Sequence, residues 1–167
     1  MGVIGGFSVI EIKQLIDENI SNYKKTSMFI GFPSCTFKCE RECGKRGLCQ
    51  NAELAISPNI QIETERVVKR YIANPLSNAV VIGGLEPFDS FAQLFHLVDI
   101  FRCRTDDDIV IYTGYYRHEI EERVGRLAQY PNIIIKFGRY IPGQKPHYDP
   151  ILGVELASDN QYAEVIS

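Results

Sequence analysis

The cysteines are the residues of this chain most able to do chemistry, because four of the five lie within fifteen residues of one another. They are Cys35, Cys39, Cys43 and Cys49, with three, three and five residues between neighbours. Clustered thiolates bind soft metal centres, and structural zinc sites usually pair cysteines two residues apart. The spacing therefore favours an iron–sulfur cluster and leaves a zinc site or reactive thiols open as alternatives.

The number of binding cysteines decides what such a centre could do. Three thiolate ligands on a four-iron cluster would leave one iron open to a substrate, whereas four would close the site. A closed site would serve structure or electron transfer, and zinc held by all four thiols would make a non-catalytic interaction domain. The cysteine segment therefore separates a redox enzyme from a binding domain.

Length and composition indicate one globular domain spanning residues 1–167. The chain is 45% hydrophobic and 23% charged with a net charge of −3, so nothing predicts a nucleic-acid partner. No apolar run approaches the ~20 residues needed to cross a bilayer, and the chain does not start with a positively charged leader. We therefore expect a cytoplasmic protein without membrane contact, in a compartment where clustered thiols stay reduced.

Strand and helix patterns alternate in a core from about residue 26 to residue 140. Short β-branched runs predict buried strands, and four strands that alternate with helices predict an α/β fold with a parallel sheet. A further helix is expected over 8–20, and the Pro- and Gly-containing segment 141–167 is expected to wrap the domain as an extended tail. The expected core strands are 28–32, 79–82, 109–112 and 133–137, and the expected core helices are 63–73, 91–101 and 117–127.

The residues suited to chemistry follow the expected strands, one group after each strand. The cysteines follow the first strand and Gly83-Gly84 the second, while Thr113-Gly114 follows the third and Gly138 the fourth. Ligands of parallel α/β sheets bind at the carboxyl ends of the strands. We therefore expect these groups to meet in one site.

Three segments carry residues that could bind a cofactor there. Gly83 and Gly84 would let a ligand approach the backbone, and Glu86 could accept a hydrogen bond from a ligand amine. The Thr113-Gly114 turn could present backbone groups to a nucleoside, and Asn160 could edge the site from the tail. Each motif alone also fits an ordinary turn or a solvated tail, so the site hypothesis depends on their convergence.

Taken together and in this order, the motifs resemble the radical S-adenosylmethionine enzymes, above all the activating proteins of anaerobic ribonucleoside-triphosphate reductase. The likeness runs from about residue 27 to residue 161. It implies a partial, open parallel β/α barrel, formed as one domain with an extended C-terminal tail. The motifs that carry it are Phe29-Ile30-Gly31-Phe32, the cysteine segment, Gly83-Gly84-Leu85-Glu86-Pro87, Thr113-Gly114-Tyr115, Gly138-Arg139-Tyr140-Ile141 and Ser158-Asp159-Asn160-Gln161.

The resemblance also implies a reaction. Three cysteines would hold a 4Fe–4S cluster, and the protein would reductively cleave S-adenosylmethionine to a 5′-deoxyadenosyl radical. This radical would generate a glycyl radical on the large subunit of anaerobic ribonucleotide reductase, with electrons from a flavodoxin- or ferredoxin-type donor. A radical enzyme acting on a small molecule is the alternative within this chemistry. The cofactor-binding residues implied are Gly83, Gly84, Glu86, Thr113, Gly114 and Asn160.

The chain departs from the family pattern at two places. The usual loop is Cys-x3-Cys-x2-Cys, but position 42, where the third cysteine is expected, is Glu. Cys49 is followed by Gln50-Asn51, as the third ligand is in the family, so we favour Cys49 over Cys43 as the partner of the first two cysteines. The second departure is Leu85, inserted before the glutamate of the glycine-rich turn.

Overall fold

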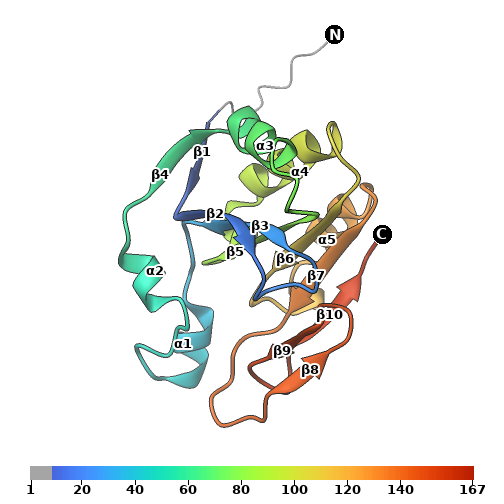
Figure 1. Cartoon of the computed structure of the whole chain (residues 1–167). Coiled ribbons are helices and arrows are strands. Elements are labelled where there is room, and N and C mark those ends of the chain that lie inside the picture. Colours follow the sequence, from blue (N-terminus) through green and yellow to red (C-terminus); the bar gives the residue numbers. More distant parts are fainter. Residues whose placement is uncertain (1–8) are drawn as a thin grey trace.

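A six-stranded mixed sheet forms the centre of the computed structural model, which describes residues 9–167 (Figure 1). Its strands lie in the order β10, β7, β6, β5, β3, β2, and the inner four run parallel. These inner strands are neighbours in both chain order and space, as expected for successive strand–helix crossovers. Their bounds are β3 Ser27–Phe32, β5 Ala79–Gly84, β6 Asp108–Tyr112 and β7 Ile133–Phe137.

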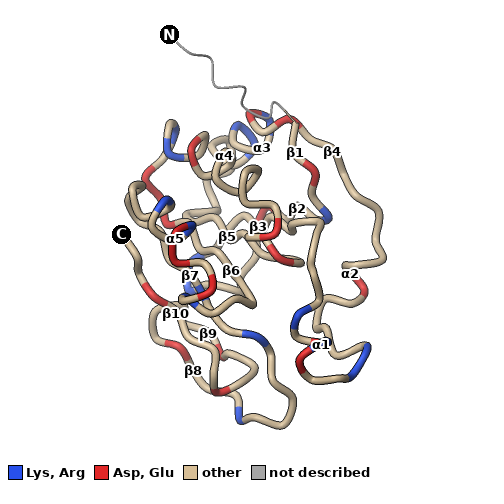
Figure 2. The backbone as a smooth tube through the Cα atoms, turned by 180° about the vertical axis from the view of Figure 1, so that it is seen from behind, with Lys and Arg blue, Asp and Glu red and all other residues tan. Residues whose placement is uncertain are grey.

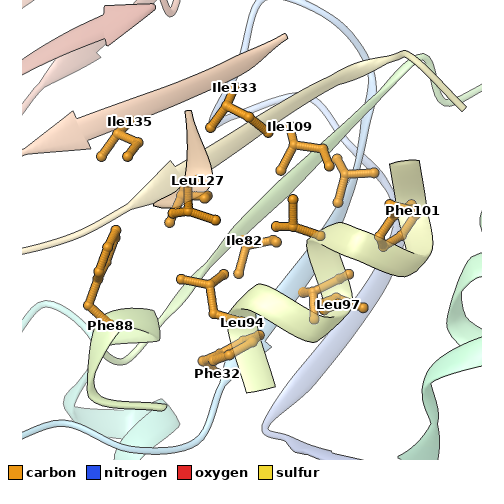
Figure 3. Packing of buried hydrophobic residues seen from close by; sticks show 14 of the residues in the cluster. Phe32, Ile82, Phe88, Leu94, Leu97, Phe101, Ile109, Leu127, Ile133 and Ile135 are labelled. Atoms are coloured by element: carbon orange, nitrogen blue, oxygen red, sulfur yellow. The ribbon is translucent and has the colours of Figure 1, made fainter. Parts of the chain in front are cut away.

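Three helices cover one face of this sheet and bury its largest apolar cluster. They are α3 Thr64–Ile72, α4 Phe91–Arg102 and α5 Glu121–Leu127. Leu94 and Leu97 of α4 point toward Ile82 and Ile109 of the neighbouring strands, and all four side chains are fully buried (Figure 3). The predicted core strands and the helices over 63–73 and 91–101 are thus confirmed, because apolar periodicity and burial coincide in each of them. The helix predicted over 117–127 is confirmed only from Glu121, because residues 117–119 form a separate 3-10 turn.

The predicted helix over 8–20 is wrong. Ser8 lies outside the described residues, and the remainder forms β1 Val9–Ile12 and β2 Gln14–Asn19. β1 pairs with β4 Ile60–Glu63, and β2 forms an antiparallel edge of the main sheet beside β3. The apolar residues of this short segment fit both a helical and a strand period, and pairing with distant strands decides between them.

The segment from residue 141 is more ordered than the expected tail. It forms the hairpin of β8 His147–Asp149 and β9 Val154–Leu156, followed by β10 Tyr162–Val165. β10 runs antiparallel to β7 and becomes the other edge of the main sheet. The observed architecture is therefore a mixed α/β fold with an open sheet, and the described residues do not form a closed barrel.

The cysteine segment lies at the end of the molecule that also carries the β8–β9 hairpin (Figure 1). It contains two short helices, α1 Lys38–Cys43 and α2 Ala52–Ile56. No residue from 33 to 59 is buried, so the hydrophobic core does not anchor the cysteine segment. The short helices η1 Pro87–Ser90 and η2 Arg117–Glu119 follow the second and third inner strands.

Charged residues of both signs are distributed along the described chain (Figure 2). The net charge of −3 is spread among 18 basic and 21 acidic residues, which limits any long-range field. None of the helices within residues 9–167 has the length and apolar character needed to cross a membrane.

Candidate metal centre

A cavity of about 300 Å³ lies at the carboxyl ends of the parallel strands. Its floor includes Phe29, Gly83 and Tyr112, which lie on the sheet face opposite the three covering helices. The cysteine segment and β9 supply further parts of its wall. The expected convergence of strand-end residues is therefore observed, because parallel strands deliver their following loops to the same edge.

Three of the four clustered cysteines line this cavity. Cys35, Cys39 and Cys49 face it, whereas Cys43, the last residue of α1, is exposed and is not among the lining residues. Burial raises the pKa of the Cys35 thiol to about 12 and also raises the pKa of Cys49. Both thiols therefore stay protonated at neutral pH in the metal-free protein, and a bound metal would have to displace their protons.

The glycine-rich turn brings β5 unusually close to β3. Gly84 has a φ of +85°, and a Cβ there would lie 2.7 Å from Gly31 Cα and 2.8 Å from Phe32 N. Only glycine combines this backbone conformation with such close packing. The side-chain amide of Asn51 donates to the carbonyl of Gly84 at 2.6 Å, which ties the segment after Cys49 to this turn.

Glu86 is a buried carboxylate at the head of this cavity. Its Oε1 accepts hydrogen bonds from Phe88 N (3.1 Å) and Thr113 Oγ1 (2.7 Å), and its Oε2 accepts from Gly114 N (2.8 Å). A carboxylate has about four acceptor positions, so one remains on Oε2 for a ligand. Burial raises the pKa of Glu86 to about 7 despite these bonds. The expected amine contact is thus compatible with the site, although the protein itself uses most of the carboxylate.

The other predicted cofactor residues divide into two groups. Thr113 and Gly114 line the cavity, but their hydroxyl and amide are engaged with Glu86. Asn160 is not a lining residue, and its side-chain nitrogen donates to Tyr116 Oη (2.9 Å) and to the carbonyl of Arg139 (2.7 Å). The geometry therefore gives Asn160 a role in holding the loop after β7, and its contact with a cofactor stays a prediction.

Arg139 connects the cysteine segment to the loops that follow β6 and β7. Its guanidinium bonds both carboxylate oxygens of Glu119 (2.6 and 2.7 Å), and its Nη2 donates to Glu42 of α1 at 2.9 Å. The arginine also donates to the carbonyl of Gly114, and it holds the pKa of Glu119 down at about 2. Glu42, which stands where the resemblance to the radical S-adenosylmethionine enzymes implies a third cysteine, is directed toward Arg139.

Asp89 makes a second polar connection to the cysteine segment. Its carboxylate accepts from Thr36 N at 2.9 Å, next to Cys35, and from Tyr115 Oη at 2.5 Å. The side chain of Ser90 makes no capping bond to α4. Asp89 therefore bridges the loop that follows β3 and the loop that follows β6.

Lys136 is a site residue that the sequence interpretation missed. It lies in β7, lines the cavity and is only 7% exposed. The signal was a single cation inside the apolar run 133–137, where a strand buried on both faces has no solvent to receive a charge.

The donor set suits an iron–sulfur cluster. Cys35, Cys39 and Cys49 offer three thiols to one sheltered cavity, and thiolates are the usual ligands of such clusters. Within residues 9–167, however, no group of three or more His, Cys, Asp or Glu side chains is already arranged to hold a metal ion. The thiols would therefore have to draw together on binding, and a segment without fully buried side chains can adjust without disturbing the core.

Comparison with known proteins identifies the family of the chain. Residues 24–158, from the start of the parallel sheet to the hairpin, match a family model described as a 4Fe-4S single cluster domain. No curated protein and no solved structure matches the chain. The matched region contains the cysteines and the whole set of parallel strands that shape the cavity. The chain therefore belongs to the family of 4Fe-4S single cluster domains and is an iron–sulfur protein.

Proposed function

We propose that this protein reductively cleaves S-adenosylmethionine and uses the resulting radical to activate a glycyl-radical enzyme. The observation that carries the proposal is the meeting of Cys35, Cys39 and Cys49 with Gly83, Gly84 and Glu86 in one cavity. Three thiolate ligands leave one iron of a four-iron cluster without a protein ligand, which allows a substrate to bind there.

The protein residues have separate roles in this proposal. The free acceptor position of Glu86 would receive the ammonium of the methionine end, while Gly83 and Gly84 let that end lie against the backbone. The turn at Thr113 and Gly114 borders the cavity where the nucleoside would lie. When bound, a reduced 4Fe–4S cluster supplies a low-potential electron.

The proposed cleavage would consume one electron for each S-adenosylmethionine. The sulfonium would accept this electron, and breaking the bond between sulfur and the 5′ carbon would release methionine and leave a 5′-deoxyadenosyl radical. That radical would take one hydrogen atom from a backbone glycine of the partner, which would give 5′-deoxyadenosine and a glycyl radical. We propose the large subunit of anaerobic ribonucleotide reductase as that partner and a flavodoxin- or ferredoxin-type protein as the donor.

Anaerobic reconstitution with iron and sulfide tests the proposal. We expect brown protein with about four irons per chain, release of 5′-deoxyadenosine and methionine on reduction with dithionite, and a glycyl-radical spectrum when the reductase subunit is added. A protein that binds iron but leaves S-adenosylmethionine intact would refute the activity. Colourless protein holding one zinc would instead support the interaction domain, and cleavage without a glycyl radical would favour a small-molecule substrate.

A further inference from the structure

Helix α1 carries the cavity-facing thiol of Cys39 but contributes no side chain to the hydrophobic core. None of its six residues is buried. Isolated helices shorter than about 12–15 residues are marginal in water, so neither its own hydrogen bonds nor apolar packing fixes this helix in place. Its position depends on polar contacts with the loops around the cavity.

Two side chains of α1 reach the same pair of residues across the rim of the cavity. Lys38 and Glu42 are four residues apart and therefore lie on the same side of the helix. The Nζ of Lys38 lies 3.3 Å from Glu119 Oε1. The Oε2 of Glu42 lies 2.8 Å from Arg139 Nε, and its Oε1 accepts from Arg139 Nη2 at 2.9 Å. Arg139 and Glu119 are themselves joined by two bonds, so the four side chains form a bridge of alternating charge, Lys38–Glu119–Arg139–Glu42.

The four-charge bridge is firm on the loop side and open on the helix side. The side chains of Arg139 and Glu119 are 7% and 19% exposed, whereas those of Lys38 and Glu42 are 39% and 54% exposed. An isolated exposed ion pair contributes little, but a two-pronged contact between arginine and carboxylate within a network contributes more. If Glu42 is removed, Arg139 still has the carboxylate of Glu119, so no buried charge is left unpaired.

The position of α1 affects a second cavity-facing thiol. The Oε1 of Glu40, also in α1, accepts hydrogen bonds from the backbone nitrogens of Gly47 (3.0 Å) and Cys49 (3.2 Å). Cys39 itself lies between Lys38 and Glu42 in the helix. The placement of this one helix therefore governs where two of the three cavity-facing cysteines lie.

We propose that Glu42 and Arg139 are positioning residues, which hold α1 on the rim through the four-charge bridge and so keep Cys39 and Cys49 within reach of one iron–sulfur cluster. Glu42 is not among the residues that line the cavity, so it acts through Arg139 and not as a carboxylate ligand of iron. Such positioning requires only a bound cluster and is independent of S-adenosylmethionine.

Release of the cluster to an iron chelator, followed anaerobically by loss of visible absorbance, tests the proposal in the reconstituted protein. Wild type is compared with Glu42→Ala and with Glu53→Ala, which removes an exposed carboxylate from α2 of the same segment. We expect Glu42→Ala to release iron on the order of 3- to 10-fold faster and Glu53→Ala to match wild type. Salt raised to about 1 M, which shortens the screening length to about 3 Å, should speed release from wild type more than from Glu42→Ala. Equal release from wild type and Glu42→Ala would overturn the proposal.

Electron paramagnetic resonance of the reduced cluster separates positioning from direct ligation. A positioning role leaves the spectrum and the iron content of freshly reconstituted Glu42→Ala unchanged. A changed spectrum would make Glu42 an iron ligand, and the proposal would be wrong.

Arg139→Lys keeps the positive charge but lacks the planar fork that joins two carboxylates. Combined with Glu42→Ala, it should release iron within about 2-fold of the faster single variant, since both changes break the same bridge. Effects that multiply would mean that the two residues act separately, against the proposal.

Hydrogen exchange of the iron-free protein gives a readout that needs no metal. We expect the segment 38–43 to exchange on the order of 3- to 10-fold faster in Glu42→Ala than in wild type, with the same midpoint of urea unfolding, because the core does not include α1. Unchanged exchange over 38–43 would refute the positioning role, even if Arg139→Lys does not take up iron. None of these measurements uses S-adenosylmethionine, so their failure is distinct from failure of the proposed function.

Discussion

The buried carboxylate of Glu86 predicts an unusual pH dependence of stability. Burial raises its pKa to about 7 in the folded protein, from an ordinary value of 4.5. The folded state therefore holds this proton more tightly than the unfolded state between these two values. The stabilisation is complete below pH 4.5 and is lost as the pH rises through 7, which is the reverse of an ion-paired carboxylate.

The magnitude follows from the pKa difference. At about 1.36 kcal/mol per pKa unit, the raised value corresponds to about 3 kcal/mol, of which about 2.5 kcal/mol disappears between pH 5 and pH 8. Arg139 lowers the pKa of Glu119 to about 2, so Glu119 loses its contribution to stability only below pH 4.5. Its titration therefore does not affect the comparison between pH 5 and pH 8. The free energy of unfolding should therefore fall across this range by more in wild type than in Glu86→Gln.

Urea unfolding of the iron-free, reduced protein measures this difference. Wild type, Glu86→Gln and the exposed control Glu122→Gln are compared at pH 5, 6, 7 and 8. The difference in unfolding free energy between wild type and Glu86→Gln should shift by about 2.5 kcal/mol in favour of the variant from pH 5 to pH 8. Glu122→Gln should show the same pH dependence as wild type. If this difference in unfolding free energy stays constant to within about 0.5 kcal/mol, burial does not raise the pKa of Glu86 and the prediction is wrong.

Two further predictions concern the cysteines and the glycine-rich turn. Cys49→Ala should abolish cleavage of S-adenosylmethionine and Cys43→Ala should retain part of it, because only the first of these thiols faces the cavity; the reverse pattern, checked with iron analysis, would make Cys43 the third ligand. Gly84→Ala should destabilise the fold by about 2–5 kcal/mol in urea unfolding, because its Cβ would lie 2.7 Å from Gly31 Cα at a positive φ. Gly125→Ala, whose Cβ meets nothing within 4 Å in α5, is the matched control and should stabilise the protein by about 0.5–1 kcal/mol; equal effects of the two alanines would contradict the close approach at Gly84.

The sequence alone determined the parallel strands and the place of the site. Runs such as Val80 to Ile82 are β-branched and are completely buried in the structure, so local composition and tertiary environment agree. The cysteine spacing indicated an iron–sulfur cluster before any geometry was known, because ligand type depends on residue identity rather than on packing. The turns after the strands could be placed together because parallel strands end at one edge.

Only the tertiary structure decided which side chains face one another. Arg139 and Glu42 are 97 residues apart in the chain, and no local pattern links them. The same holds for β1, which pairs with β4 beyond the cysteine segment, and for β10, which forms one edge of the sheet beside β7.

The tertiary structure also decided how the cysteines and Lys136 are oriented. Cys43 and Cys49 have the same side chain, yet the turn of α1 exposes one thiol while the bond from Asn51 to Gly84 holds the segment of the other at the cavity. Lys136 stands in an apolar strand whose face toward the cavity is set by the two-residue alternation of the sheet. Residue type states what chemistry is available, and packing alone decides which groups reach the same ligand.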